Sequence, residues 1–226
     1  MSKIERLSKN IATNISKNLS IDKDQEEVIA YGAFALFQTG ISILAVIVFG
    51  IIFNVLAEAL VISVSAAILR KYSGGAHATE PMSCVLIGMV VFGGMALLVR
   101  HVIIKQELLF VVIYMAVALA IGVYIIYKYS PVGTANKPLK NEAKRNRLRR
   151  QSLKCVLIFI SIIVAFTIAS LVLQNTHLLL IALSVTTGIL WQSITLVSHG
   201  HFIINILDKL VLGVTKIFKG GQTNEK

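Results

Sequence analysis

Long apolar runs separated by short polar segments dominate the chain. Four of the last five runs contain 18 to 21 residues, and the six runs are 28–53, 55–69, 82–99, 108–127, 155–173 and 178–198. Because about 20 apolar residues in a helix cross a hydrocarbon core of roughly 30 Å, this pattern predicts an all-α, polytopic integral membrane protein with six transmembrane helices. Run 55–69 has only 15 residues and contains Glu58, so it is expected to be tilted, kinked or partly re-entrant.

Two amphipathic segments flank the apolar runs. In residues 1–27 and again in 199–226, apolar residues recur at helical spacing among Lys, Ser and other polar residues. Helices of this kind lie in the plane of a membrane surface. The sequence therefore predicts one membrane domain over residues 1–226, with spans 1–4 in 28–127, a basic loop in 128–154, spans 5–6 in 155–198 and an amphipathic segment at each end.

Positive charge is concentrated between the apolar runs. The net charge is +11, and nine of the 22 Lys and Arg residues lie in 128–154. Basic loops stay on the cytoplasmic side of a membrane, so we expect both termini, residues 70–84 and residues 128–154 to face the cytoplasm of a cell-membrane protein. Anionic inner-leaflet lipids are expected partners, whereas no pattern typical of nucleic-acid recognition accompanies the basic residues.

Residues 70–84, RKYSGGAHATEPMSC, carry the candidate chemistry. Pro81 suits the first turn of a helix, which places Cys84 about one turn in, where the helix dipole favours a thiolate. His77 precedes Cys84 by seven residues, across a segment that a turn can fold back. The pair supplies a nucleophile and a general base or ion-pair partner, although a helix-capping loop would contain similar residues.

Four further residues have two interpretations each. Gly74 and Gly75 either supply N–H groups to an oxyanion hole or only turn the chain. Arg70 either reaches lipid headgroups or binds a substrate carboxylate. Glu58 either orients His77 or lies near the far membrane interface.

No metal or cofactor is expected. The loop offers only one Cys, one His and Glu80 as ligands, and a pair such as His199 and His201 falls short of a four-ligand zinc site. The chain lacks both an HExxH motif and a P-loop. A zinc protease is therefore less plausible than a cysteine enzyme.

The string of Arg70, Gly75, His77 and Cys84, placed between the second and third of six spans, resembles the accessory gene regulator B (AgrB) family of Gram-positive bacteria. The resemblance covers essentially the whole chain and implies a membrane cysteine endopeptidase that processes an AgrD-like quorum-sensing propeptide. It also implies that Cys84 is the nucleophile and His77 its base, and that Arg70 and Gly75 are needed for activity. Loss of the propeptide tail would leave a thioester, which an internal Cys or Ser closes into a thiolactone or lactone.

The basic loop then has a specific expected role, which is to hold the acidic tail of the propeptide. The candidate docking residues are Lys144, Arg145, Arg147, Arg149 and Arg150. A homodimer is favoured by the resemblance and by a small-residue stripe in span two. Two rival interpretations remain: a non-catalytic peptide transporter, and a scaffold in which His77 and Cys84 are incidental.

Overall fold

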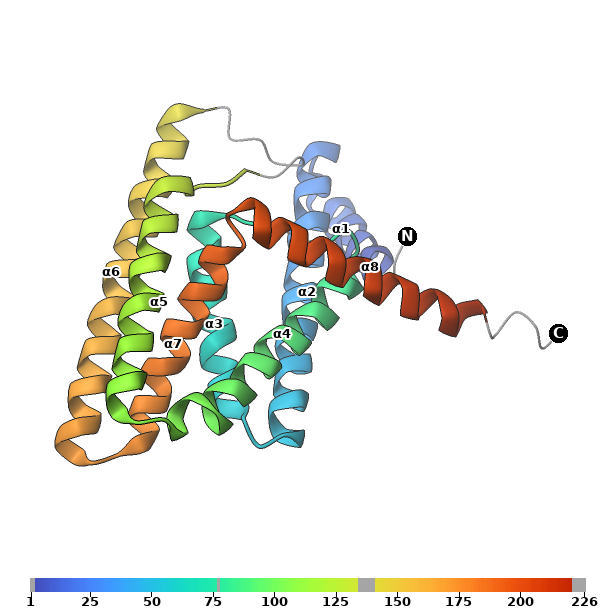
Figure 1. Cartoon of the computed structure of the whole chain (residues 1–226). Coiled ribbons are helices and arrows are strands. Elements are labelled where there is room, and N and C mark those ends of the chain that lie inside the picture. The colour runs from blue at the N-terminus through green and yellow to red at the C-terminus, as the bar shows by residue number, and fades with distance from the viewer. Residues whose placement is uncertain (1–2, 77, 134–140, 221–226) are drawn as a thin grey trace. The chain divides into compact units, whose positions relative to one another are not determined.

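The computed structural model describes residues 3–76, 78–133 and 141–220, so His77 lies outside the described residues. Within these ranges the protein is helical (Figure 1), with a short 3-10 turn at Ile103–Lys105 and no strand. The α-helices are α1 Lys3–Leu19, α2 Lys23–Ile52, α3 Leu56–Ser73, α4 Pro81–His101, α5 Leu108–Tyr129, α6 Glu142–Leu173, α7 Thr176–Ile194 and α8 Ser198–Gly220. The predicted all-α class is confirmed.

Five of these helices, judged over the part of the chain that the structure describes, are long and apolar enough to cross a membrane: α2, α4, α5, α6 and α7. The chain is therefore a polytopic membrane protein, as predicted, but the count of six spans is not reproduced. Helix α3, which corresponds to the second predicted span, is not among the five, because it carries Glu58 at one end and Arg70 and Lys71 at the other.

Two compact units divide the chain, Met1–Ala45 and Val46–Lys226. In the first unit, the amphipathic helix α1 buries Ser8 and Ala12. The hydroxyl of Thr13 donates a hydrogen bond to the Glu26 carboxylate in α2 at 2.6 Å. This bond joins the predicted N-terminal amphipathic segment to the start of the first apolar helix.

Helix α7 is the centre of the second unit. It packs against α3, α5 and α6 (Figure 1), and most of its side chains are buried. Its closest approach is to α3, where a Cβ on Gly188 would lie 2.7 Å from the carbonyl oxygen of Ile62. Glycine at this position lets the two backbones pack closely, as small residues do between membrane helices.

Helices α3 and α4 pack against each other and run in opposite directions. At one end, Arg100 of α4 forms a 2.8 Å ion pair with the buried carboxylate of Glu58 in α3. Arg70 lies twelve residues further along α3, roughly 18 Å at 1.5 Å per residue. The hairpin therefore separates the Glu58 end from the end that carries Arg70 and Cys84.

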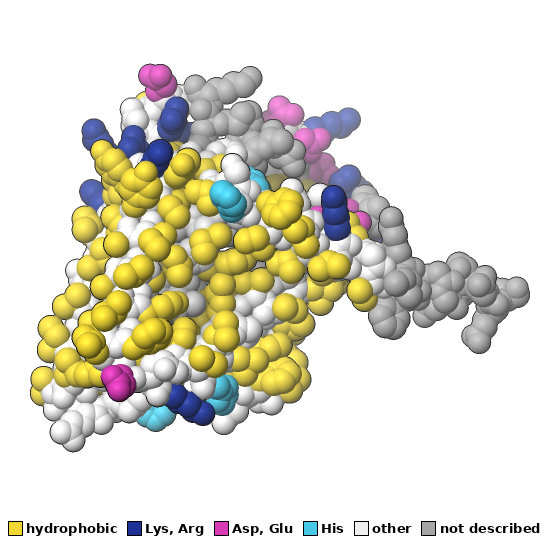
Figure 2. Space-filling view, viewed as in Figure 1, with side chains coloured by type: hydrophobic (Ala, Val, Ile, Leu, Met, Phe, Trp, Pro, Cys, Tyr) yellow, Lys and Arg dark blue, Asp and Glu magenta, His cyan; other side chains and the backbone are white. Residues whose placement is uncertain are grey.

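The outer faces of the helices are apolar (Figure 2). Large hydrophobic side chains are exposed along α5 and α6, including Leu109, Ile113, Leu157, Ile168 and Val172. Exposed apolar faces on this scale mark contact with hydrocarbon rather than water. They agree with the membrane location that the composition predicts.

The predicted basic loop is partly helical. Helix α6 begins at Glu142, where the Asn141 side chain accepts a 3.1 Å hydrogen bond from the Lys144 N–H and caps the helix. Residues 142–154 of the predicted basic loop thus form the first turns of α6, and residues 128 and 129 end α5. An N-cap asparagine followed by good helix formers explains the early start.

We expect Gly188→Ala to weaken the second unit, because the added methyl group lies 2.7 Å from the Ile62 carbonyl oxygen and 3.0 Å from the Ser65 Cβ. Overpacking of this kind lowers stability by about 1–3 kcal/mol. Thermal unfolding in detergent measures the effect. Gly94→Ala is the control, since no atom lies within 4 Å of a Cβ there; equal melting temperatures for both variants would contradict the packing described here.

Candidate active site

Cys84 lies in the first turn of α4. Pro81 occupies the start of the helix, and the Cys84 N–H donates to the Glu80 carbonyl at 3.1 Å. The thiol is free and half-buried. This is the position expected from the sequence, about one turn into the helix that Pro81 begins.

Arg70, in the last turn of α3, lies beside the same loop. Its Nη2 donates a hydrogen bond to the carbonyl oxygen of Ala76. Arg70 lies in the last turn of α3 and Cys84 in the first turn of α4, so two of the residues predicted from the sequence lie at the two ends of the same loop.

Gly74 and Gly75 turn the chain out of α3 with positive φ values of 73° and 133°. A Cβ on Gly75 would lie 2.7 Å from the Thr195 Oγ1, so a larger residue is excluded by both strain and space. The Gly74 N–H donates to the Arg70 carbonyl at 2.9 Å. Of the two glycines, only Gly75 has an N–H without an acceptor among the described residues.

The end of α7 holds this turn. Buried Gln192 donates from Nε2 to the Ser73 Oγ at 3.0 Å and to the Gly74 carbonyl at 2.7 Å. The Thr195 carbonyl accepts the Ala76 N–H at 3.1 Å. Sequence reasoning missed both residues because they lie inside an apolar run; the polar cluster QSIT at its end was the available indication.

Asp208 of α8 holds the next part of the loop. Its Oδ2 accepts hydrogen bonds from the Thr79 N–H at 2.9 Å and from the Thr79 hydroxyl at 2.5 Å. Burial raises the pKa of this carboxyl, but hydrogen bonds from Thr79 and Ser83 outweigh burial and leave the pKa below its ordinary value. The carboxylate therefore stabilises the fold at neutral pH, and this contribution is lost in acid as the pH falls through the folded-state pKa.

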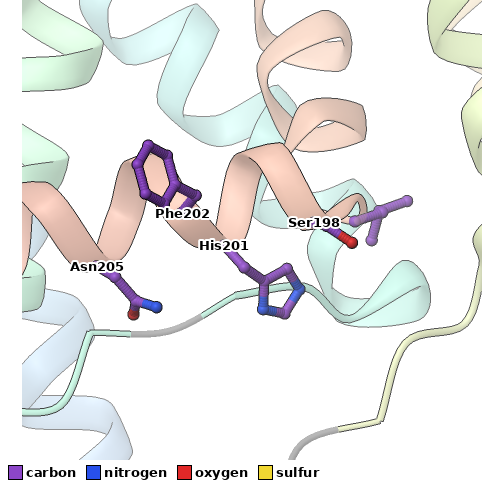
Figure 3. A pocket seen from close by; sticks show the side chains of 5 residues that line it. Ser198, His201, Phe202 and Asn205 are labelled. Atoms are coloured by element: carbon purple, nitrogen blue, oxygen red, sulfur yellow. The ribbon is translucent and has the colours of Figure 1, made fainter.

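An open pocket of about 450 Å³ lies along α8, lined by Leu196, Ser198, His201, Phe202 and Asn205. Figure 3 shows the His201 and Asn205 side chains projecting from α8 on the side where the ribbon between α3 and α4 passes. His201 is one of the two histidines considered above as metal ligands. Among the described residues, no three His, Cys, Asp or Glu side chains gather as a metal site requires.

Glu58 is not brought to this site, since it pairs with Arg100 at the opposite end of the α3–α4 hairpin. The predicted docking residues lie in the first turns of α6, where Lys144, Arg145, Arg147 and Arg150 are exposed. Arg149 donates to the Tyr127 carbonyl at 2.7 Å and covers the Tyr127 ring.

The basic residues share the end of the second unit that carries the loop. The Val132 N–H, just after α5, donates to the Ser73 carbonyl at 2.8 Å. Figure 2 shows Lys and Arg side chains gathered over the ends of α5 and α6. The residue just after α5 thus contacts the end of α3, from which the chain runs on to Cys84.

Comparisons with known proteins agree on one family. The model of the family described as Accessory gene regulator B matches residues 8–196. The chain is 35% identical over 206 residues to an AgrB-like protein of Clostridium perfringens (strain SM101 / Type A), covering 91% of this chain and 96% of that one. No solved structure matches the chain.

Two further relatives are more distant. The protein FsrB of Enterococcus faecalis (strain ATCC 47077 / OG1RF) is 28% identical over 210 residues, covering 89% of this chain and 84% of that one. The accessory gene regulator protein B of Staphylococcus aureus (strain MW2) is 28% identical over 128 residues, covering 57% and 65%. The similarity therefore extends across relatives with different names.

We expect Gln192→Leu to loosen the turn after α3, because it removes two hydrogen bonds and leaves the half-buried Gly74 carbonyl with only the longer 3.4 Å hydrogen bond from the Ser73 hydroxyl. A typical hydrogen bond contributes about 0.5–1.5 kcal/mol to stability. Hydrogen exchange at residues 74–79 should rise. Ser184→Ala in the same helix is the control, since its buried hydroxyl has no partner among the described residues; similar exchange in both variants would rule out Gln192 as the support of the turn.

Proposed function

The chain belongs to the accessory gene regulator B family, which acts in quorum sensing, and we propose that it is a membrane cysteine endopeptidase. Its substrate would be an AgrD-like propeptide, from which it removes the C-terminal tail. The observation that carries this proposal is the half-buried Cys84 thiol in the first turn of α4, at the end of a loop whose other end Arg70 holds through the Ala76 carbonyl.

The first chemical step is attack by the Cys84 thiolate on the carbonyl carbon that precedes the tail. A tetrahedral oxyanion forms, and the Gly75 N–H is a better candidate donor to it than the Gly74 N–H, which already bonds to Arg70. His77, assigned from the sequence motif alone, protonates the amine of the leaving tail. The C–N bond breaks, and the rest of the peptide stays on Cys84 as a thioester.

The second step closes a ring. A Cys or Ser side chain within the signal segment attacks the thioester carbonyl and gives up its proton, and the Cys84 sulfur leaves as thiolate. Exchange of one thioester for another is nearly balanced in energy, so no nucleotide is required. Apolar helix ends around the site would limit hydrolysis by excluding water.

The α6 segment from Lys144 to Arg150 is proposed to bind the acidic tail. Its four exposed cations support this role, and so does Arg149, whose hydrogen bond to the Tyr127 carbonyl holds this part of α6 against the end of α5. A positively charged face raises the local concentration of an acidic peptide. The same cations would contact anionic lipid headgroups, consistent with a site at the cytoplasmic face and with both termini on that side.

A homodimer remains a prediction. In the small-residue stripe that favours it, Ala59 is buried within this chain, Ser63 is half-buried and Ala67 is exposed. Only the Ala67 end of the stripe is therefore accessible to a second copy. For the rival transporter interpretation, the candidate polar residues Thr186 and Thr187 are buried and donate to carbonyls of their own helix, which gives a transport path little support.

We expect Cys84→Ala to abolish both tail release and the thioester adduct when the purified chain in nanodiscs is mixed with the propeptide encoded beside its gene. His77→Ala should slow both by about 10²- to 10⁴-fold, the usual contribution of a general acid or base. Intact mass spectrometry measures both products. Cys155→Ala, which removes the buried thiol of α6, is the control; cleavage that survives Cys84→Ala would overturn the proposed function.

Neutralising Arg145, Arg147, Arg149 and Arg150 together to Gln should lower kcat/KM at low salt by about tenfold or more, because steering of a charged substrate is lost. The difference from the native chain should shrink as salt is added. Lys105→Gln, at the opposite end of the hairpin, serves as the control. Salt-independent processing at the native rate in the fourfold variant would refute tail docking on α6.

A further inference from the structure

The carboxylate of Asp208 contacts the loop between α3 and α4, which carries the candidate chemistry. Asp208 is not part of the sequence motif of Arg70, Gly75, His77 and Cys84. It lies on α8, beyond residues 8–196 that match the family model. Its side chain is 4% exposed. A carboxylate this buried on a surface-type helix calls for a physical reason, because burial of a charge without full compensation opposes folding.

Thr79 supplies two of the hydrogen bonds that compensate this burial. Both the N–H and the hydroxyl of Thr79 donate to the same oxygen, Oδ2, at 2.9 Å and 2.5 Å. Hydrogen bonds to an ionised acceptor are stronger than those between neutral groups. The contact therefore fixes the backbone and the side chain of Thr79 at once, two residues before α4 begins at Pro81.

The other oxygen, Oδ1, is buried without a hydrogen-bond partner among the described residues. A side chain selected only for stability would fill this valence or would be apolar. A buried carboxylate with one unpaired oxygen is better explained by the segment that it anchors. That segment contains Thr79 and leads into the first turn of α4, where Cys84 lies.

We propose that Asp208 is a positioning residue for the Cys84 reaction, which anchors Thr79 and thereby sets the start of α4 and the direction of the thiol. The proposal rests on the proposed cysteine endopeptidase function. Asp208 does not touch the reacting atoms in this assignment. Through Thr79 it acts on the geometry in which the substrate carbonyl meets the sulfur.

The test compares Asp208→Ala, Asp208→Asn and Thr79→Val with the native chain in nanodiscs, using the propeptide encoded beside the gene. Single-turnover formation of the Cys84 adduct should fall by about a hundredfold in Asp208→Ala at saturating peptide, the loss typical of a misplaced reacting group, with KM unchanged. Asp208→Asn keeps an acceptor for Thr79 and should recover most of the rate. Thr79→Val should slow the reaction and add little to Asp208→Ala, because both changes break the same contact.

Lys209→Ala is the matched control, since Lys209 is the exposed neighbour on the same helix. Hydrogen exchange at residues 79–84 should rise in Asp208→Ala and stay native in Lys209→Ala, and both variants should remain folded at the assay temperature. A native adduct rate in Asp208→Ala would overturn the positioning role and leave the proposed function intact. If the native chain forms no adduct, the proposed function fails instead, and unchanged exchange in Asp208→Ala would then refute the anchor itself.

Discussion

The backbone leaves helical geometry after α3 where Ser73, Gly75 and Ala76 are buried. A buried backbone group without a hydrogen bond costs about 1–3 kcal/mol, and intrahelical bonds cannot supply the partners once the glycines turn the chain. Gln192 and the Thr195 carbonyl, at the end of α7, bond to the Gly74 carbonyl and the Ala76 N–H, while the Gly75 N–H has no acceptor among the described residues. The shape of the site therefore depends on where α7 ends.

The geometry of the site therefore depends on how closely α3 and α7 pack in the second unit. Gly188 lets α7 approach the carbonyl of Ile62 in α3 closely. One turn further along, the same approach brings Gln192 to Ser73. If the two helices were spaced for larger residues, the amide would not reach the turn. A small residue in the apolar core thus determines whether a polar loop at its end can form.

The sequence was sufficient for everything that depends on local pattern. Apolar run lengths predicted the helices, and Pro81 predicted the start of α4 and the position of Cys84 in its first turn. Contacts between distant segments were not predictable in this way. Gln192 is one polar residue in an apolar run, and Asp208 lies 129 residues from Thr79. The partner of Glu58 was not predictable from the sequence either, because Arg100 reaches Glu58 only when α3 and α4 pack against each other.

The charges around the loop follow from the polarity of its backbone. Ala76 presents a carbonyl oxygen, for which Arg70 is a strong donor, and Thr79 presents an N–H, for which the Asp208 carboxylate is a strong acceptor. A cation can only donate and a carboxylate can only accept, so exchanging the two signs would break both contacts. Arg70 is thus accounted for without a substrate carboxylate or a lipid headgroup.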